Sequence, residues 1–425
     1  MRGQTQKQHL SDQSYVVTGH LFPIIQIKVH HSKQLQLKAP RIIILTGVTD
    51  DNYRSQRTDN PIVSTSAGKR ILLYRAIESA AGAAPLLLSP HPRGRGRPSA
   101  LPAMESNFDR FTQRFSRASG IRKVRFFLDL LHYASHVHRN TKNGDVLIMD
   151  NYELIYVLAI YYLRLRGRRN RIVLEYEDGK HLIDKGWIGW LSGLAEFLGK
   201  RLVGGAIVAA PALVERLPGG IPVEIVPGIL GEDIRMNPLP IDGSPIRFIY
   251  SGSLDFERGV PLLLDYLESG QMAENAVFHV TGQGHFVKRF EGLAERHPGK
   301  IVFHGCVSRE ELGRIQQSCH FGLNLQISDN PISQVTYPSK TFDYLNAGLG
   351  IVSTRAAAVD TVLGNIPVYM DTETGEGLAD AINRITGHAF PCQPADLSSM
   401  AGYSLQGTIK RLVAVIRPAT NIHNP

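Results

Sequence analysis

Apolar residues recur along the first half of this chain as short continuous runs that alternate with longer, helically spaced segments. The runs predict strands at 41–46, 85–89, 145–150, 172–176, 206–209 and 223–226. Helical spacing predicts helices at 67–81, 152–166 and 187–198, and one or two basic amphipathic helices within 106–139. Continuous apolar strands between helices are typical of a parallel sheet that is covered on both faces.

The alternation restarts at residue 246. It predicts strands at 246–251, 277–281, 301–305, 321–325, 351–354 and 368–370. Helices are predicted at 260–268, 285–296, 308–317, 338–348 and 376–386. Between the two halves, residues 227–244 are rich in Gly and Pro, which favours an interdomain linker. The predicted fold class is therefore α/β, with two Rossmann-like, doubly wound parallel-sheet domains facing across a cleft.

The domain boundaries follow from these patterns. Residues 1–39 are polar and weakly periodic, and we expect a poorly ordered extension there. Residues 40–229 and 230–390 are predicted to form the first and second domains. Residues 391–425 are predicted to form a tail or helix that packs back toward the first domain.

An apolar stripe marks the predicted helix 187–198. Its members recur at i, i+3, i+4 and i+7 spacing, and they are Trp187, Trp190, Leu191, Leu194, Phe197 and Leu198. Such a stripe is usually the side of a helix that packs on a core. We therefore expect these side chains to be buried.

Composition narrows the class of protein. The chain has 425 residues, of which 43% are hydrophobic and 20% charged, as expected for a globular protein with two cores. The three cysteines have no CxxC spacing, so neither a disulfide framework nor a zinc site is indicated, and a cytoplasmic location is favoured. The longest apolar run, 154–163, is far shorter than the roughly 20 residues of a membrane-spanning helix. The first residues lack an apolar signal segment.

Net charge adds a candidate partner. The formal charge is +9, and the excess is concentrated in the first half. Residues 91–125 contain nine Arg or Lys and two acids, and residues 164–171 contain five Arg and no acid. Such clusters attract an anionic membrane surface or nucleic acid, or they form a plain solvated face. Nucleic acid is not expected, because the clusters lack interleaved aromatics and a recognisable binding module.

Residues 337–348 predict a short helix with charged side chains near its start. Pro338 suits the first turn, and Gly348 suits the stop because glycine readily adopts the left-handed conformation. Lys340 then lies in the first turn, and Asp343 lies one turn later on nearly the same side. Phosphate is attracted to such a helix start, and a carboxylate beyond it can accept hydrogen bonds from a ribose diol. The segment fits a nucleotide, and equally an ordinary amphipathic helix.

Other polar residues also follow predicted strands. Ligands of open parallel sheets bind beyond the carboxyl ends of the strands. The candidates at such positions are Asp150, Glu177, Asp178, Ser253, Arg258, Gln283, Asn330, Ser339, Lys340 and Asp343. A metal-protease site is not expected, because His132 and His136 have i, i+4 spacing without a glutamate between them.

Four sequence elements follow one another in the second half. The first is Tyr250-Ser251-Gly252-Ser253-Leu254 with Glu257-Arg258-Gly259-Val260, and the second is His279 to Gly284. The third is Val302 to Val307, and the fourth is Tyr337-Pro338-Ser339-Lys340 through Gly348. In this order and at this spacing they resemble the retaining GT-B glycosyltransferases of the family 4 type. In the first half, Ser66-Ala67-Gly68-Lys69-Arg70 is similar to the family's glycine-rich turn. Tyr176-Glu177-Asp178 stands where the family often has His-Asp.

The resemblance implies roles for these residues. Arg258 would contact the donor diphosphate together with Lys340, and Asp343 would bind the ribose hydroxyls. The implied nucleotide-sugar site also includes Gly252, Ser253, Gly282, Gly284, Val307 and Ser339. Gly68, Lys69, Glu177 and Asp178 would lie on the acceptor side, with Glu177 or Asp178 orienting the acceptor as part of the catalytic set.

Two positions depart from the family pattern. Ser253 replaces a basic residue, so one diphosphate charge is missing, and Lys340 is a candidate to replace it. Val335 replaces the first glutamate of the family's E-x7-E pattern, which in many members contacts the donor sugar. Asn330, Ser333 and Gln334 are nearby substitutes, and the sequence does not choose among them. The donor sugar and its base therefore stay open.

The implied activity is transfer of a sugar, with retention, from a nucleotide-diphosphate sugar to a glycan or lipid-linked acceptor. The resemblance places such a reaction in bacterial surface polysaccharide or lipopolysaccharide synthesis, in the cytoplasm or on the inner face of the membrane. No cofactor or metal is expected. Two alternatives stay open: a GT-B sugar-nucleotide epimerase, and a non-catalytic nucleotide-sugar-binding partner of another transferase.

Overall fold

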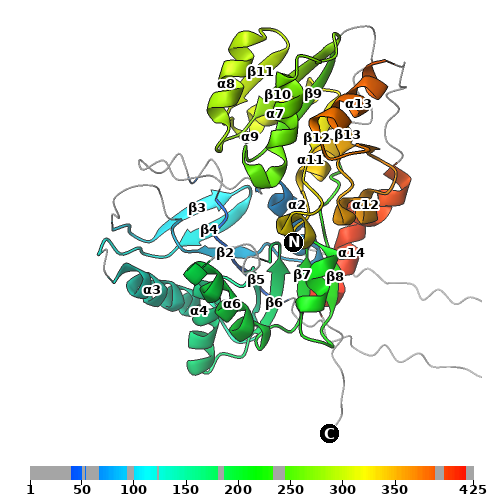
Figure 1. Ribbon diagram of the computed structural model, residues 1–425. Helices are drawn as coiled ribbons and strands as arrows, with labels where there is room; N and C mark the ends of the chain where they lie inside the picture. The colour runs from blue at the N-terminus through cyan, green and yellow to red at the C-terminus, as the bar shows by residue number, and fades with distance from the viewer. Residues whose placement is uncertain are drawn as a thin grey trace, which may run out of the picture. The chain divides into compact units, whose positions relative to one another are not determined.

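The computed structural model describes residues 40–49, 53, 67–92, 100–121, 124–179, 186–232, 245–387 and 397–417 (Figure 1). The predicted extension at 1–39 lies outside the described residues. So do parts of the predicted linker and of the predicted tail. Residues Ala39–Pro425 form one compact unit, which contains two sheets.

The first sheet has eight strands in the order β3-β4-β2-β1-β5-β6-β7-β8, and every pair except β3–β4 is parallel. The sheet reverses its strand order at β1, which lies between β2 and β5. The strands are β1 (Ile42–Leu45), β2 (Leu86–Ser89), β3 (Met104–Phe108), β4 (Phe111–Phe115), β5 (Val146–Asp150), β6 (Arg171–Tyr176), β7 (Ala206–Val208) and β8 (Val223–Ile225).

Helices cover both faces of this sheet because its strands are apolar on both sides. Ile43 and Leu45 of β1 share a core with helices α3 and α4, whereas Ile42 and Ile44 share a core with α2 and α14. Helix α14 thus packs on the first sheet, and Arg417 after it donates a hydrogen bond to the Ala81 carbonyl. The helices are α2 (Ala67–Ala81), α3 (Arg125–Asn140), α4 (Leu154–Leu165), α6 (Gly186–Lys200) and α14 (Leu405–Ile416), with 3-10 segments η1 (Pro211–Arg216) and η3 (Leu397–Tyr403).

The prediction of one or two helices within 106–139 is wrong for the first part of this range, because helix α3 begins only at Arg125. Residues 104–115 form the antiparallel pair β3–β4, which turns at Asp109 with a φ of 54°. Along β4, Phe111, Gln113 and Phe115 are buried and alternate with half-buried residues. That period of two is the period of a strand.

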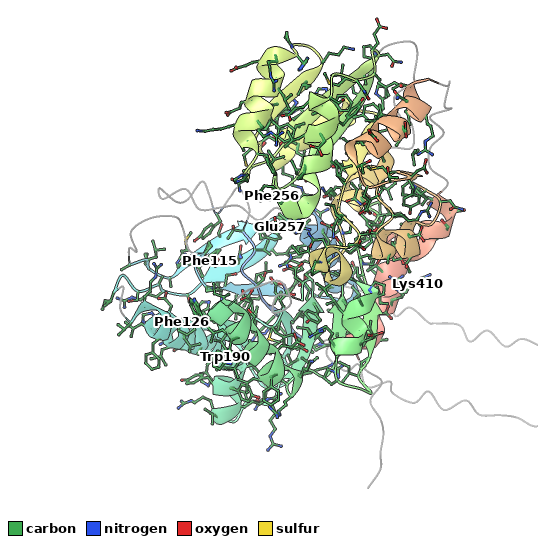
Figure 2. The ribbon with its side chains drawn as sticks, in the orientation of Figure 1. Phe115, Phe126, Trp190, Phe256, Glu257 and Lys410 are labelled. Atoms are coloured by element: carbon green, nitrogen blue, oxygen red, sulfur yellow. The ribbon has the colours of Figure 1, made fainter. Side chains whose placement is uncertain are left out.

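The expectation that the Trp stripe of α6 is buried is also wrong. Trp187 is 72% exposed and Trp190 is 67% exposed, and Figure 2 labels Trp190 on this helix. The buried residues of α6 are Ala195, Glu196 and Gly199, and a Cβ at Gly199 would overlap the ring of Tyr152. Small residues therefore form the side of α6 that packs closely.

The second sheet has six strands in the order β11-β10-β9-β12-β13-β14, and all pairs are parallel. The strands are β9 (Ile246–Ser251), β10 (Ala276–Thr281), β11 (Ile301–Gly305), β12 (Phe321–Asn324), β13 (Gly350–Ser353) and β14 (Val368–Tyr369). The connecting helices are α7 (Val260–Glu268), α8 (Val287–Arg296), α9 (Arg309–Gln317), α10 (Pro331–Val335), α11 (Lys340–Asn346), α12 (Ala357–Leu363) and α13 (Gly375–Thr386), with η2 at Phe256–Arg258.

Apart from the antiparallel edge strand β3, both sheets are parallel and doubly wound as predicted from the sequence, so the α/β fold class is confirmed. In the second sheet the strand order reverses at β9, which lies between β10 and β12. Such a reversal is where ligands of open α/β sheets bind. Within the described ranges, no helix is long and apolar enough to cross a membrane.

Candidate functional site

The loops after β9 and β10 are bonded to each other at the carboxyl end of the second sheet. The Leu254 amide donates to the Gln283 carbonyl at 2.9 Å, and the Gly252 amide donates to Thr281 at 3.1 Å. Gly282 has a φ of 146°, and a Cβ there would overlap the Gly252 carbonyl oxygen. Glycine is therefore required at 282, because the two loops approach each other backbone to backbone.

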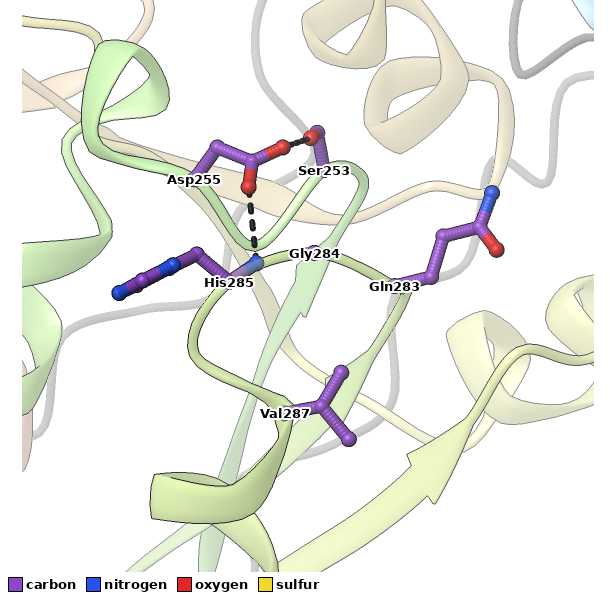
Figure 3. A pocket seen from close by; sticks show the side chains of 6 residues that line it. All are labelled: Ser253, Asp255, Gln283, Gly284, His285 and Val287. Carbon is purple, nitrogen blue, oxygen red and sulfur yellow. Dashed lines mark hydrogen bonds between the residues drawn. The ribbon is translucent and has the colours of Figure 1, made fainter.

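These loops line a solvent-open hollow of about 610 Å³ (Figure 3). The Ser253 hydroxyl donates a hydrogen bond to Asp255, whose other oxygen accepts from the His285 amide at 2.8 Å. Asp255 thus joins the two loops, and the hydroxyl proton of Ser253 is used in the hydrogen bond to it. The sequence reasoning missed Asp255 and His285, although the Ser-x-Asp spacing in a strand-end loop was a usable signal. The hollow is lined by Ser253, Asp255, Gln283, Gly284, His285 and Val287.

Lys340 and Arg258 lie near each other at the same end of β9. The Lys340 ammonium lies 4.1 Å from the ring centroid of Tyr250, the fifth residue of β9. Burial, and after it the charge of Arg258, lower the pKa of Lys340 to about 7. A desolvated lysine beside a second cation is destabilised in its charged form. An anion that binds there would be stabilised by both groups.

Helix α11 begins two residues later than predicted. It covers Lys340–Asn346, and Ser339 precedes it without a side-chain capping bond. Asp343 is half-buried in α11, and burial raises its pKa to about 6, while Arg309 and Lys69 oppose that rise. A Cβ at Gly68 would lie 3.3 Å from an Asp343 carboxylate oxygen. The start of α2 therefore lies next to Asp343.

Lys69 and Glu177, both predicted on the acceptor side, form an ion pair of 2.7 Å. The Lys69 side chain is almost fully buried. Asn151, which follows β5 with a φ of 52°, accepts hydrogen bonds from the amides of Glu177 and Asp178 at 2.8 and 3.1 Å. Asn151 was not singled out from the sequence, although asparagine is the residue expected at such a left-handed position.

The acid that ends β5 belongs to a buried cluster. Asp150 accepts from Arg70 at 2.8 Å, and the Arg70 Nε lies 3.7 Å from a carboxylate oxygen of Glu175. Burial raises the pKa of Glu175, which is fully enclosed. Asp150 is therefore engaged with Arg70, and Glu177 and Asp178 are the strand-end acids that stay near the surface.

The position expected to hold the donor-sugar glutamate is part of a core. Val335 ends α10 and is buried with Tyr337 and Phe342. Two of its proposed substitutes have structural partners: Asn330 accepts from the Ile332 amide at 3.0 Å, and Ser333 donates to the Ile327 carbonyl at 2.5 Å. The side chain of Gln334 lies outside the described part. Elsewhere, Val307 is half-buried in the loop after β11.

A scan against models of protein families finds no match, and no curated protein matches this sequence. Solved structures do match. The Anabaena protein Alr3699/HepE in complex with UDP and glucose is 12% identical, with a TM-score of 0.61, over 88% of this chain and 98% of that one. The E. coli trehalose-6-phosphate structure with UDP-2-fluoro glucose is 12% identical, with a TM-score of 0.59, over 88% and 96%.

A third neighbour is the apo form of the lipopolysaccharide outer core galactosyltransferase WaaB. It is 13% identical, with a TM-score of 0.57, over 88% of this chain and 99% of that one. These neighbours are GT-B glycosyltransferases. At 12 to 13% identity the likeness shows the fold, and the chain has the GT-B fold of two Rossmann-like domains.

Proposed function

We propose that this GT-B chain is a glycosyltransferase that moves a sugar from a nucleotide-diphosphate sugar to a glycan or lipid-linked acceptor. The observation that carries the proposal is the pair of cations, Lys340 and Arg258, at the strand reversal of the second sheet. The structural neighbours support it, because two of them hold UDP or a UDP-sugar analogue.

The chemistry requires a nucleoside diphosphate to leave an anomeric carbon. Negative charge develops on the leaving phosphate, so catalysis needs fixed positive groups there. Lys340 and Arg258 would supply them, and we propose that they act in place of a divalent metal. Because the pKa of Lys340 is about 7, this lysine is only about half-protonated at pH 7 in the free protein. A bound diphosphate would draw a proton onto this lysine.

Asp343 is proposed to bind the ribose of the donor. Its carboxylate is half-buried and accepts no hydrogen bond from any described residue. It is mostly ionised at pH 7, because its pKa is about 6. A ribose diol offers two hydroxyl donors to such a group. These contacts are common to many donors, so they leave the sugar itself undetermined.

We further propose that transfer proceeds with retention and that the leaving phosphate accepts the proton of the attacking hydroxyl. Glu177 or Asp178 would orient the acceptor, because Asn151 holds both residues beside the carboxyl end of β5. Bacterial surface polysaccharide synthesis is the proposed setting, in keeping with the neighbour that is a lipopolysaccharide galactosyltransferase. Contact with an anionic membrane belongs to the same proposal, because lipid-linked acceptors are reached at a bilayer.

A thermal-shift screen of nucleotide-diphosphate sugars tests the donor part, because a ligand of the native state raises the melting temperature. We expect a hit for the wild type and its loss in Lys340→Ala, with Lys410→Ala as the matched surface control. Transfer to lipid-linked and soluble acceptors is then assayed with the hit. Absence of any hit, or normal transfer by Lys340→Ala, would refute the assignment. Conversion of the donor without acceptor would identify an epimerase instead.

A further inference from the structure

Large apolar side chains are exposed mainly in one part of the first domain. Of the twelve that are exposed in the described ranges, ten lie between residues 121 and 197, and the other two are Phe256 and Val413. Isolated exposed hydrophobics are normal on protein surfaces, but a concentration of them marks an interaction site. Seven of the ten lie on α3 and α6. All of these except Phe197 define the aromatic face: Phe126, Phe127, Leu131, Trp187, Ile188 and Trp190.

The two helices that carry the aromatic face are joined by α4. His138 of α3 packs its ring against Tyr162 of α4, with centroids 6.0 Å apart. Tyr161 of α4 donates to the Leu198 carbonyl of α6 at 3.0 Å. Figure 2 shows Phe126 and Trp190 on this group of helices. The three helices therefore form one continuous layer.

The sheet topology places the aromatic face at one edge of that layer. β4, β5 and β6 all belong to the parallel run of the first sheet, and each is followed by one of these helices. A helix that returns over a parallel sheet begins at the carboxyl edge of its strand. Trp187 and Trp190 lie in the first turns of α6, and Phe127 lies in the first turn of α3. They are thus at the edge where Glu177 follows β6.

The opposite ends of the same helices are basic. Exposed cations lie at or shortly after the carboxyl ends of the three helices, and they are Arg139, Lys142, Arg166, Arg169 and Arg201. The acids of this layer, by contrast, are buried or half-buried: Asp129, Asp145, Glu153 and Glu196. The outward side of the layer therefore combines exposed aromatic rings with positive charge and displays no fully exposed carboxylate among its described residues.

We propose that the aromatic face and its basic rim form the surface by which this protein docks on an anionic phospholipid bilayer. The inference rests on the membrane part of the proposed function and names the residues responsible. Tryptophan rings are stable at the headgroup level of a bilayer, and the cations at the other ends of the same helices are attracted by anionic headgroups. Docking would bring Glu177 and the acceptor side to the lipid surface, where a lipid-linked acceptor resides.

The test is co-sedimentation of the full chain with vesicles of equal parts phosphatidylglycerol and phosphatidylcholine, compared with phosphatidylcholine alone. We expect binding to the anionic vesicles at low salt and its loss at high salt, because salt screens exposed charges. Trp187→Ser/Trp190→Ser should lower the partition coefficient by about tenfold or more, since two large apolar side chains leave the interface. Arg166→Glu/Arg169→Glu should lower it as well.

Matched controls lie in other parts of the chain. Phe256→Ser removes an exposed aromatic ring of the second domain, and Lys410→Glu reverses an exposed charge of α14, which packs on the other face of the first sheet. Both should bind vesicles like the wild type. Absence of binding at low salt, equal binding to both vesicle types, or equal loss in the controls would overturn the proposal.

Two further measurements separate the possible outcomes. If light scattering shows a dimer that the Trp187→Ser/Trp190→Ser variant converts to a monomer, and no vesicle binding occurs, a second copy covers the aromatic face and the proposal is wrong. Thermal shift with the donor is measured on the same variants. Vesicle binding that persists in Lys340→Ala, which should lose the donor shift, would support docking independently of sugar transfer.

Discussion

Donor affinity should depend on pH through Lys340. Burial and Arg258 lower the pKa of this lysine to about 7, so in the free protein it is half-protonated at pH 7 and about 1% protonated at pH 9. A bound diphosphate would restore a pKa near the ordinary value of about 10.4. As the pH rises above 7, Lys340 loses its proton in the free protein but keeps it in the bound state. Binding then requires the uptake of a proton, so donor affinity falls with rising pH. The expected fall in affinity between pH 7 and pH 9 is about 50-fold.

The assay is calorimetric titration with the nucleotide sugar that gives the largest thermal shift, in two buffers of different ionisation enthalpy. A nucleotide sugar is preferred to a free diphosphate, whose terminal phosphate titrates near pH 6. Asp343, with a pKa of about 6, stays ionised throughout this range and adds little to the slope. Proton uptake should rise from about one half at pH 7 toward one at higher pH.

Lys340→Arg provides the control, because an arginine stays charged across the whole range. Its affinity for the donor should be nearly independent of pH, whereas Lys410→Arg should keep the wild-type slope. An affinity that is flat between pH 7 and pH 9 in the wild type would refute the reasoning. So would a Lys340→Arg variant that retained the full slope.

Three more outcomes follow from the geometry. Asp343→Ala should weaken donor binding by about 10- to 100-fold in the same titration, because hydrogen bonds to a charged group are lost, and Asp343→Glu should restore part of it. In urea unfolding, Gly282→Ala should lower the free energy of unfolding by at least about 2 kcal/mol more than Gly252→Ala. Of these two positions, only at 282 would the new Cβ overlap a carbonyl oxygen. Equal losses in the two variants would contradict this account. Arg70→Met should lower the free energy of unfolding in urea by about 3–5 kcal/mol, because the carboxylate of Asp150 would stay buried without its cationic partner. A double variant with Asp150→Leu that recovers no stability would argue against that explanation.

The predicted elements held best where the apolar pattern was long and unambiguous. The helix predicted at 67–81 has those bounds in the structure, as do the strands at 246–251 and 301–305. The prediction failed at residues 104–115, because basic and apolar residues alternate there in a way that also fits an amphipathic helix. The structure decides for strands over a helix, because Phe108 pairs with Phe111 across a turn. The periodicity of a single segment does not show such pairing between two strands.

The candidate site was likewise predictable from the sequence only in part. Strand-end positions identified Lys340, Arg258 and Asp343 as candidates, because a parallel sheet gathers such positions at one edge. Their ionisation was beyond the sequence, since the lowered pKa of Lys340 arises from burial and from Arg258, a residue 82 positions away. The hydrogen bond from the His285 amide to Asp255 was likewise visible only in the tertiary structure, because it joins two loops.

The sequence by itself determined that this chain builds two doubly wound parallel sheets, because the period and length of apolar runs set the type of each element locally. Only the tertiary structure decided which apolar side chains are covered. Trp187 and Trp190 have the helical spacing of a core stripe, yet they are exposed, because Ala195 and Gly199 make the close contact of α6. Periodicity shows that a helix has an apolar side, but burial depends on what packs against it.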